Sequence, residues 1–275
     1  MKGGSAGKLW VVATPIGNLG DLSPRAQQAL RDVGVIAAED TRHSRPLLQH
    51  FGIATPLTAL HEHNERAAVV ALMAKLQAGE DVALISDAGT PLISDPGFRL
   101  VRAARAAGIR CIPIPGACAA IAALSVAGLP SDRFVFEGFL PPKSAARRAR
   151  LQELAGEPRT LIFYESSHRV AESLADMRAV FGDGREAVLA RELTKLFETV
   201  LDEPLAQLAE RVANDPDQQR GECVILVAGR GEEADAKLAE GQRIFAILRE
   251  ELPPAKAAKL AAAISGAPRK LLYEG

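Results

Sequence analysis

Short apolar runs alternate with amphipathic or polar segments through the first half of the chain. The runs that we expect to be strands lie at residues 9–14, 33–38, 56–60, 81–86 and 109–114. The spacing between them predicts helices that start at Ser23 and at Thr41, and helices over residues 64–77 and 96–107. Strands this apolar, separated by helices, are typical of a parallel sheet that helices cover on both faces.

The pattern changes around residues 129–132, and a second α/β set follows. Its strands are expected at 160–164, 187–191 and 223–227, and its helices at 167–181 and 205–213. A polar stretch at 229–236 suggests a linker. Short helices at 243–250, 254–263 and 268–273 then have the spacing of a helix-turn-helix module. We therefore expect an N-terminal α/β domain at 8–130, a C-terminal α/β domain at 131–230, and a linker with a helical tail at 231–275.

The composition is that of a folded protein. Hydrophobic residues make up 48% and charged residues 24% of the 275 residues, which excludes disorder and collagen-like repetition. The formal net charge of −1 provides no basic field around the whole molecule, so any RNA partner must be held by local patches. Aromatic residues are only 4% of the chain, which argues against a platform for stacking single-stranded bases.

The cysteines favour a protein of the reducing cytoplasm, and the uncharged segment is interpreted as part of the fold rather than as a membrane span. The three cysteines have no C-x-x-C spacing, which argues against a disulfide framework or a zinc site. Residues 111–131 carry no charge and are long enough for a membrane span. Two prolines and a glycine interrupt this stretch, so we interpret it as a buried strand, a turn and a buried helix.

A glycine-containing turn follows the first expected strand, at residues 12–21. Such a turn between a strand and a helix lets backbone N–H groups approach a ligand. Glu39 and Asp40 end the next strand about 20 residues later, where a ribose-binding acid would stand. Gly17 and Gly20 do not form G-x-G-x-x-G, so a nucleotide-binding loop and a structural turn both remain open.

Two further loops follow expected strands at the same sheet edge. Residues 85–97 contain two aspartates, two glycines and two prolines, a preorganised composition that favours a functional loop. Open α/β sheets bind ligands at the carboxyl ends of their strands. Residues 113–120 have only small side chains after the strand, which suits either a closely approaching ligand or close helix packing.

Polar residues also end strands of the second set. Tyr164 and Glu165 follow one strand and Lys195 follows another, so they are expected to face a common cleft or to form ordinary caps and salt bridges. A basic run at 143–150 is either a solvated helix face or a phosphate contact. We discount a metal site at His61 and His63 because no third ligand is evident.

Seven motifs occur together and in order. They are residues 13–21, 39–42, 61–65, 86–97, 115–117, 137–141 and 164–166. The set closely resembles the ribosomal RNA small subunit methyltransferase I family, the 16S rRNA (cytidine(1402)-2'-O)-methyltransferases of the tetrapyrrole methylase superfamily. The resemblance covers about residues 8 to 230 and is highly specific. The tail resembles the helix-turn-helix of that family less distinctively.

The resemblance implies two α/β domains with S-adenosylmethionine in the cleft between them, and commonly a homodimer. It also implies methyl transfer to the ribose 2'-oxygen of cytidine C1402 in 16S rRNA of the small ribosomal subunit, in the cytoplasm. Relatives that act on porphyrinoids carry G-x-G-x-G-D in the first loop and S-G-D-P in the second. Both loops of this chain differ from those patterns, which counts against the alternative of a small tetrapyrrole-like substrate. A third hypothesis is a non-catalytic nucleotide- or RNA-binding module.

On this basis we assign candidate residues to three roles. The cofactor is expected against Pro15, Gly17, Ser86, Asp87, Ala88, Gly89, Leu92, Ile93, Ser94, Pro115, Gly116, Ala117 and Leu140. The substrate is expected against Asp40, Arg42, Tyr164, Glu165, Arg169, Arg147 and Arg148. Asp21, Lys195 and Glu198 are candidates for catalysis, with no general base assigned. On a helix, Lys195 and Glu198 would share a face, which is equally consistent with an ion pair.

Overall fold

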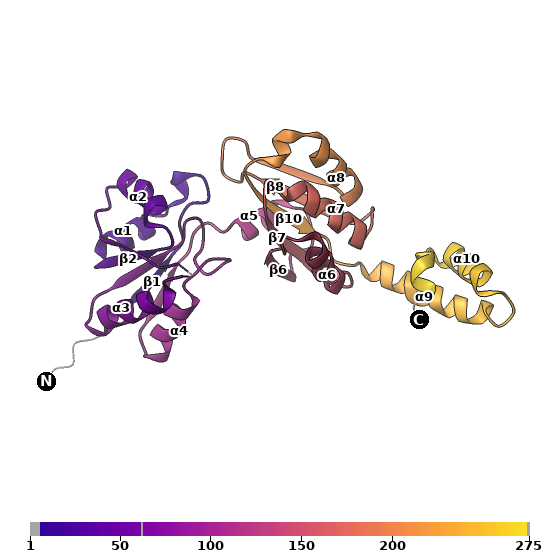
Figure 1. Cartoon of the computed structure of the whole chain (residues 1–275), viewed down its shortest axis with the longest axis horizontal. Helices are drawn as coiled ribbons and strands as arrows, with labels where there is room; N and C mark the ends of the chain where they lie inside the picture. Colours follow the sequence, from indigo (N-terminus) through magenta and orange to yellow (C-terminus); the bar gives the residue numbers. More distant parts are fainter. Residues whose placement is uncertain (1–5, 62, 274–275) are drawn as a thin grey trace.

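The computed structural model describes residues 6–61 and 63–273. They form two α/β units, each built around a five-stranded sheet, and a small helical tail. Figure 1 shows the first unit at one end of the molecule, the second in the middle and the tail at the other end.

The first sheet has the strand order β3-β2-β4-β1-β5, and all of its neighbouring strands are parallel. Its strands are β1 (Leu9–Val12), β2 (Val35–Ala38), β3 (Leu57–Ala59), β4 (Val82–Ile85) and β5 (Cys111–Ile114). The helices between them are α1 (Pro24–Asp32), α2 (Thr41–His50), α3 (Glu65–Gln77) and α4 (Phe98–Ala106). The parallel sheet predicted from the apolar runs is therefore confirmed, with element ends shifted by a few residues.

Both faces of this sheet are buried. Ala83 and Ile85 of β4 belong to the same hydrophobic cluster as Leu30 of α1, whereas Val82 and Leu84 belong to the cluster of α3 and α4. Successive side chains of a strand point to opposite faces, so burial of both faces needs apolar residues at every position. This is why β4 is a continuous apolar run rather than an alternating one.

The second sheet has the order β6-β7-β10-β8-β9 and is mixed. Only β6 and β7 are parallel, and the other neighbours are antiparallel. Its strands are β6 (Phe134–Phe139), β7 (Thr160–Ser166), β8 (Glu186–Arg191), β9 (Thr199–Pro204) and β10 (Glu222–Val227). One face is covered by α6 (Ser144–Leu154), α7 (Val170–Phe181) and α8 (Leu205–Asn214).

Three elements of this unit were not predicted. β6 is interrupted by Gly138, where its register with β7 shifts. β9 is an edge strand that ends in Asp202, Glu203 and Pro204, so it lacks an apolar run. α6 coincides with the basic run and was expected only as a helix face, without bounds.

Helix α5 (Ala119–Val126) packs on the second sheet although it follows β5 of the first. Ala123 and Leu124 share a hydrophobic cluster with Ile162 of β7 and Val224 of β10. The change from one sheet to the other therefore comes directly after β5, earlier than residue 130. The predicted limits of the domains did not anticipate this packing, because an alanine-rich helix after a strand suits either sheet.

The tail comprises α9 (Glu232–Leu248), α10 (Pro254–Ser265) and the short 3-10 helix η3 (Arg269–Tyr273). It has its own hydrophobic cluster of Phe245, Ala257, Ala258, Ala261, Ala267 and Leu272. The expectation of a linker up to residue 236 is wrong, because α9 already begins at Glu232. The sequence there is rich in Glu, Ala, Lys and Leu, which favour helix. No helix in the described ranges is long and apolar enough to cross a membrane.

Candidate functional site

Hydrogen bonds join the loops that follow β1, β4 and β5. The backbone N–H of Thr14 donates to the Gly89 carbonyl at 2.9 Å, and the Gly89 N–H donates back at 3.1 Å. The hydroxyl of Thr14 donates to the Ser86 carbonyl at 3.2 Å, and that of Thr90 donates to the Ala117 carbonyl at 2.9 Å. Strands β4, β1 and β5 are neighbours, so these loops form one continuous edge of the first sheet.

The loop after β4 has a strained backbone. Leu92 and Ser94 have φ angles of 74° and 67°, a conformation that costs non-glycine residues about 1 kcal/mol or more. Gly89 has a φ of 82°, and a Cβ at this position would lie 3.2 Å from Cγ2 of Ile16. Strain of this kind is concentrated at ligand-binding sites, where the surrounding structure enforces it.

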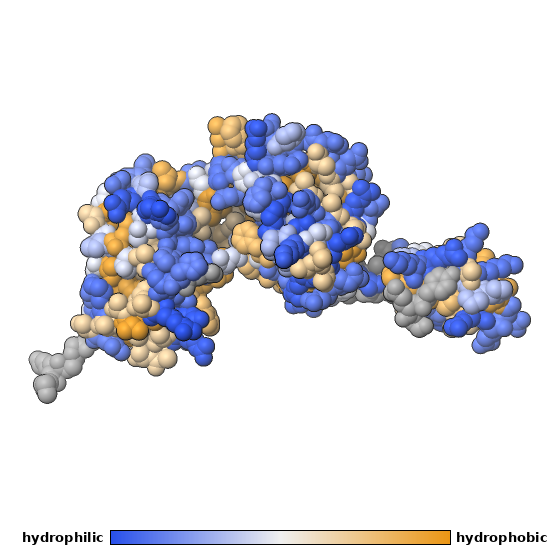
Figure 2. All heavy atoms as spheres, viewed as in Figure 1, coloured by the Kyte–Doolittle hydropathy of each residue, from blue (hydrophilic) through white to orange (hydrophobic). Residues whose placement is uncertain are grey.

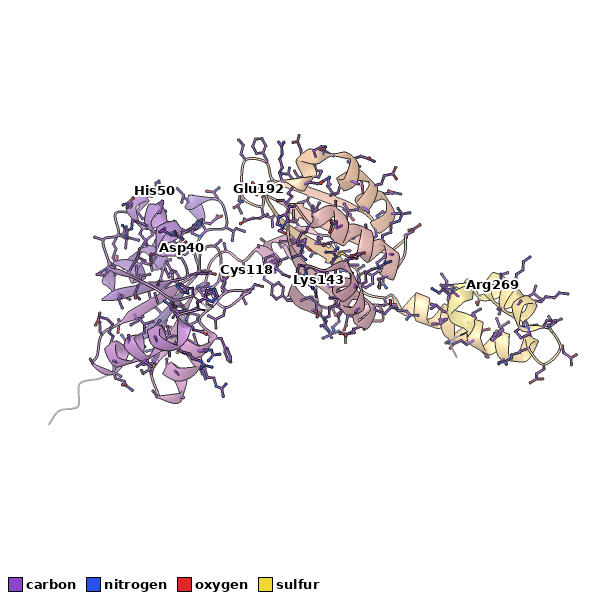
Figure 3. The ribbon with its side chains drawn as sticks, viewed as in Figure 1. Asp40, His50, Cys118, Lys143, Glu192 and Arg269 are labelled. Carbon is purple, nitrogen blue, oxygen red and sulfur yellow. The ribbon has the colours of Figure 1, made fainter. Side chains whose placement is uncertain are left out.

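A cavity of about 320 Å³ lies between this edge and the second unit. From residues before β6 it is lined by Ile16, Ala88, Gly89, Thr90, Ile93, Ser94, Asp95, Cys118 and Ala119. From the second unit it is lined by Phe139, Tyr164, Glu165, Ser166, Ser167, Ala190, Leu193, Gly221, Glu222, Cys223 and Val224. Figure 2 shows the surface hollowed between the two units. Figure 3 places Cys118 at this junction.

Tyr164 forms part of the far wall. Its hydroxyl accepts a hydrogen bond from the Ala120 N–H at 3.1 Å, at the start of α5. Its ring lies edge-on to Phe136 and Phe139, with centroid distances of 5.0 and 5.7 Å. Burial raises the pKa of Tyr164 well above its ordinary value, and the nearby Cys118 adds to this. The phenol therefore stays neutral at physiological pH.

Glu165 is 3% exposed and fully engaged by its own unit. Its carboxylate accepts hydrogen bonds from the Ser173 hydroxyl at 2.5 Å and the Ser166 N–H at 2.8 Å, and it lies 3.4 Å from Arg169. Arg169 also donates to the Leu140 carbonyl at 2.8 Å. The sequence placed these residues around the substrate and cofactor, and the structure joins them into one network that reaches the cavity through Glu165.

Asp95 lines the cavity from the loop after β4, and the sequence analysis did not select it as a candidate. Burial raises its pKa to about 6, and the nearby Asp87 carboxylate raises it further while a hydrogen bond with Ser86 opposes the shift. Asp95 lies inside the motif at residues 86–97, so its position after a buried strand was the available signal. Leu193 and Cys223 also line the cavity, but nothing in the sequence separates them from core residues.

The loop between β8 and β9 approaches the first unit. The Lys195 ammonium lies 2.7 Å from Glu192 and 3.0 Å from Glu222. Burial favours a lower pKa for Lys195, but the hydrogen bonds to these two carboxylates raise it above its ordinary value. Glu198 instead accepts a hydrogen bond from the Thr194 N–H at 2.6 Å. Lys195 and Glu198 lie in the loop between β8 and β9 rather than on a helix, so they share no helix face, and no ion pair joins them among the described residues.

A second, more open cavity of about 500 Å³ lies near the N-terminus of α2. Asp40 accepts hydrogen bonds from the Arg42 N–H at 2.8 Å and its guanidinium at 2.8 Å, and these hold the pKa of Asp40 well below its usual range. The Asp40 N–H donates to the Asp87 carboxylate at 3.0 Å. Asp87 therefore lines this second cavity rather than the first. Asp21 is exposed at the end of the 3-10 helix η1 (Leu19–Asp21).

The basic run at 143–150 was expected to form either a solvated helix face or a phosphate contact, but Arg147 of α6 is buried. Its side chain is 1% exposed and lies 2.8 Å from Asp176, so it is unavailable to a substrate. Arg148 is 53% exposed and lies 3.5 Å from the same carboxylate. The sequence could not show which of the two arginines is buried, because Arg147 and Arg148 are adjacent residues of the same type.

The structure brings together part of the predicted set. Ala88, Gly89, Ile93 and Ser94 line the first cavity, together with the substrate candidates Tyr164 and Glu165. The remaining cofactor candidates lie outside its lining: Pro15, Gly17, Ser86, Asp87, Leu92, Pro115, Gly116, Ala117 and Leu140. The catalytic candidates Asp21, Lys195 and Glu198 are outside it as well. In the described residues, no group of three or more His, Cys, Asp or Glu side chains is arranged to hold a metal ion.

Comparison with known proteins gives the relationship of the chain. The family model described as Tetrapyrrole (Corrin/Porphyrin) Methylases matches residues 8–209, and one described as RsmI C-terminal HTH domain matches residues 235–274. Two proteins named ribosomal RNA small subunit methyltransferase I are each 65% identical to this chain. The one from Xylella fastidiosa aligns over 98% of both chains, and the one from Pseudomonas aeruginosa over 98% of this chain and 96% of its own.

A solved structure agrees with this fold. Uroporphyrin-III C-methyltransferase from Thermus thermophilus, complexed with S-adenyl homocysteine, has a TM-score of 0.55 and 17% identity. The match covers 81% of this chain and 97% of that protein. The fold is thus the tetrapyrrole methylase fold with an added C-terminal helix-turn-helix domain. The chain belongs to the tetrapyrrole methylases and, within them, to the ribosomal RNA small subunit methyltransferase I family.

Proposed function

We propose that the protein methylates the ribose 2'-oxygen of a cytidine in 16S rRNA of the small ribosomal subunit, with S-adenosylmethionine as methyl donor. The observation that carries the proposal is the 65% identity to proteins named ribosomal RNA small subunit methyltransferase I, which extends over 98% of the chain. The nucleotide C1402 follows from the family resemblance of the motifs. The small tetrapyrrole-like substrate has no support beyond a shared fold.

The cavity suits this cofactor in size and chemistry. Its volume of about 320 Å³ is within the range of small-molecule sites, and Ala88 and Gly89 leave the backbone open to a ligand. Ile16, Phe139 and Leu193 provide apolar surface for a purine ring, while Asp95 provides a negative charge. When bound, the cofactor supplies an electrophilic methyl group on a sulfonium. The role of the protein is to hold both reactants in line and to exclude water.

The surroundings of Lys195 restrict the catalytic role that it can have. Lys195 is held by two carboxylates and its pKa is raised, so it stays protonated and is unsuited as a general base. We assign it the role of a positive charge that stabilises the developing charge on the ribose oxygen or orients a phosphate. Asp21 and Glu198 remain candidates for contact with the ribose.

We also propose a homodimer that acts in the cytoplasm, where the small ribosomal subunit is found, and a role for residues 231–275 in docking RNA. The tail is suited to this because it has its own hydrophobic cluster and stands apart from both sheets. Arg148, Arg42 and Arg169 are the proposed contacts with RNA on the two α/β units. Light scattering of the purified protein tests the dimer.

The decisive experiment is transfer of tritiated methyl groups to purified small subunits that lack this modification, followed by nuclease mapping of the labelled nucleoside. We expect label on the ribose of a single cytidine. A parallel reaction offers uroporphyrinogen III as acceptor. Transfer to the tetrapyrrole with none to the subunits would overturn the proposal.

A further inference from the structure

Asp95 differs from the other carboxylates that line the first cavity. Glu165 lies 3.4 Å from Arg169, and Glu222 lies 3.0 Å from Lys195. Within residues 6–61 and 63–273, no Lys, Arg or His nitrogen lies within ion-pair distance of the Asp95 carboxylate. A negative charge therefore faces the cavity without a cation to balance it.

The groups around Asp95 do not supply that cation. Its own loop contributes the Ser86 hydroxyl, which hydrogen-bonds to it, and the Asp87 carboxylate, which repels it. Tyr164 of β7 and Cys118 at the start of α5 line the same cavity, and neither side chain can carry a positive charge. Charge balance is therefore left to a ligand, because a half-buried carboxylate without a partner is costly to ionise.

We propose that Asp95 recognises the sulfonium charge of S-adenosylmethionine, so that the cavity binds the charged methyl donor more tightly than the neutral thioether product. This inference rests on the proposed function for the identity of the cofactor. It assigns a specificity-determining residue: Asp95 distinguishes the two forms of one nucleoside by a single charge, which favours exchange of product for donor after each methyl transfer.

The surroundings of Asp95 fit a sulfonium better than an ammonium. An ammonium has three N–H donors and needs several acceptors, whereas a sulfonium has none. The same cavity is lined by Ile93, Phe139 and Tyr164, which offer apolar and aromatic surface to a cation that has no N–H donors. A permanent cation is stabilised by such rings together with a carboxylate.

The proposal predicts that binding of the donor depends on pH. In the free protein the pKa of Asp95 is about 6, and a bound cation lowers it because it favours the carboxylate form. Donor affinity therefore rises as pH increases through this range and levels off above it, while a proton is released on binding near pH 6. The thioether product carries the same amino and carboxyl groups without the sulfonium, so its affinity has a smaller pH dependence.

The test is calorimetry of the full chain with S-adenosylmethionine and with S-adenosylhomocysteine between pH 5 and pH 7.5. For a decrease of about one pKa unit, donor affinity rises about fivefold between pH 5 and pH 7.5 and product affinity less than about twofold. In Asp95→Asn, donor affinity at pH 7.5 falls about tenfold and loses its pH dependence, while product affinity is unchanged. Asp132→Asn, which removes an exposed carboxylate, is the control and binds both ligands as the wild type does.

Each contrary outcome has a distinct meaning. Equal weakening of both ligands in Asp95→Asn would assign the residue to the amino group and overturn the inference, as would unchanged donor affinity. If the variant does not fold, the pH series on the wild-type protein still decides, and equal pH profiles for the two ligands would reject the idea. Failure of the wild-type protein to bind either ligand would overturn the proposed function itself.

Discussion

The side chain of Lys195 lies against the backbone of Gly17, where the loop after β8 meets the loop after β1. A Cβ at Gly17 would overlap Cγ of Lys195 and lie 2.9 Å from its Cε. Lys195 is fixed from the other side by Glu192 and Glu222. The loops after β1 and β8 therefore touch at a position where an added Cβ would force the Lys195 side chain to move.

Gly17→Ala tests whether that contact matters for methyl transfer. The added methyl group displaces the Lys195 side chain and separates the two loops. We expect the single-turnover rate of methyl transfer to small subunits to fall about tenfold, which corresponds to about 1.4 kcal/mol. Gly184→Ala is the matched control, since a Cβ there meets no atom within 4 Å. A normal rate in Gly17→Ala would show that the contact is dispensable.

Gly89→Val tests the loop after β4 as part of the cofactor site. The residue has a φ of 82°, and a Cβ would lie 3.2 Å from Ile16 at the cavity wall. The branched side chain also fills the approach path, so we expect the affinity for S-adenosylmethionine to fall at least about tenfold by calorimetry. Gly108→Val is the control, because its φ is 71° and it has no neighbour within 4 Å. Equal affinities in both variants would remove this loop from the site.

The sequence was most informative about the first sheet and the loops at its edge. Burial on both faces makes β4 a continuous apolar run, and the composition of residues 85–97 marks a preorganised loop, so both could be predicted locally. β9 could not, because an edge strand needs no apolar run. The sheet on which α5 packs could not be predicted either. It depends on which sheet has an uncovered face, and that is decided by the whole fold.

In the candidate site, too, some residues could be predicted from the local sequence and others depend on the whole fold. Gly89 and Ser94 could be selected from the loop motif, and both line the cavity. Lys195 was selected as a catalytic candidate, but it pairs with Glu192, 3 residues before it in a loop, and with Glu222, 27 residues after it. Side-chain pairing of this kind depends on the antiparallel register of β8 and β10, which the sequence alone does not reveal.

Arg147→Met tests the buried ion pair under α6. Removal of the guanidinium leaves the Asp176 carboxylate buried with only the Ser144 hydroxyl and the more distant Arg148 as partners. We expect the free energy of unfolding to fall by about 3 kcal/mol in urea denaturation. Arg148→Met, at a side chain that is 53% exposed, changes it by less than about 1 kcal/mol. Similar losses in the two variants would contradict the structural role of Arg147.

Deletion of residues 233–275 separates cofactor binding from docking of RNA. The cavity lining ends at Val224 and the tail has its own hydrophobic cluster, so the truncated protein should bind S-adenosylmethionine within about twofold of the full chain. Methyl transfer to small subunits should fall at least about tenfold, because the proposed RNA contact is lost. A truncated protein with full activity on small subunits would exclude the tail from substrate recognition.

Asp95→Asn also has an expected effect on stability, opposite in sign to its effect on donor binding. Burial raises the pKa of Asp95 to about 6 from a model-peptide value of 3.8, so between these values the folded protein binds more protons than the unfolded chain. The free energy of unfolding therefore decreases as pH rises from about 4 to about 6 and is constant above that range.

Because Asp95 is only half-buried, solvent screening limits the contribution to about 1 kcal/mol. At pH 7.5 the asparagine variant should be more stable than the wild type by this amount in urea denaturation, and at pH 4 the difference should vanish. A variant that is less stable at pH 7.5 would show that the ionised carboxylate is stabilised within the fold itself rather than held ready for a ligand.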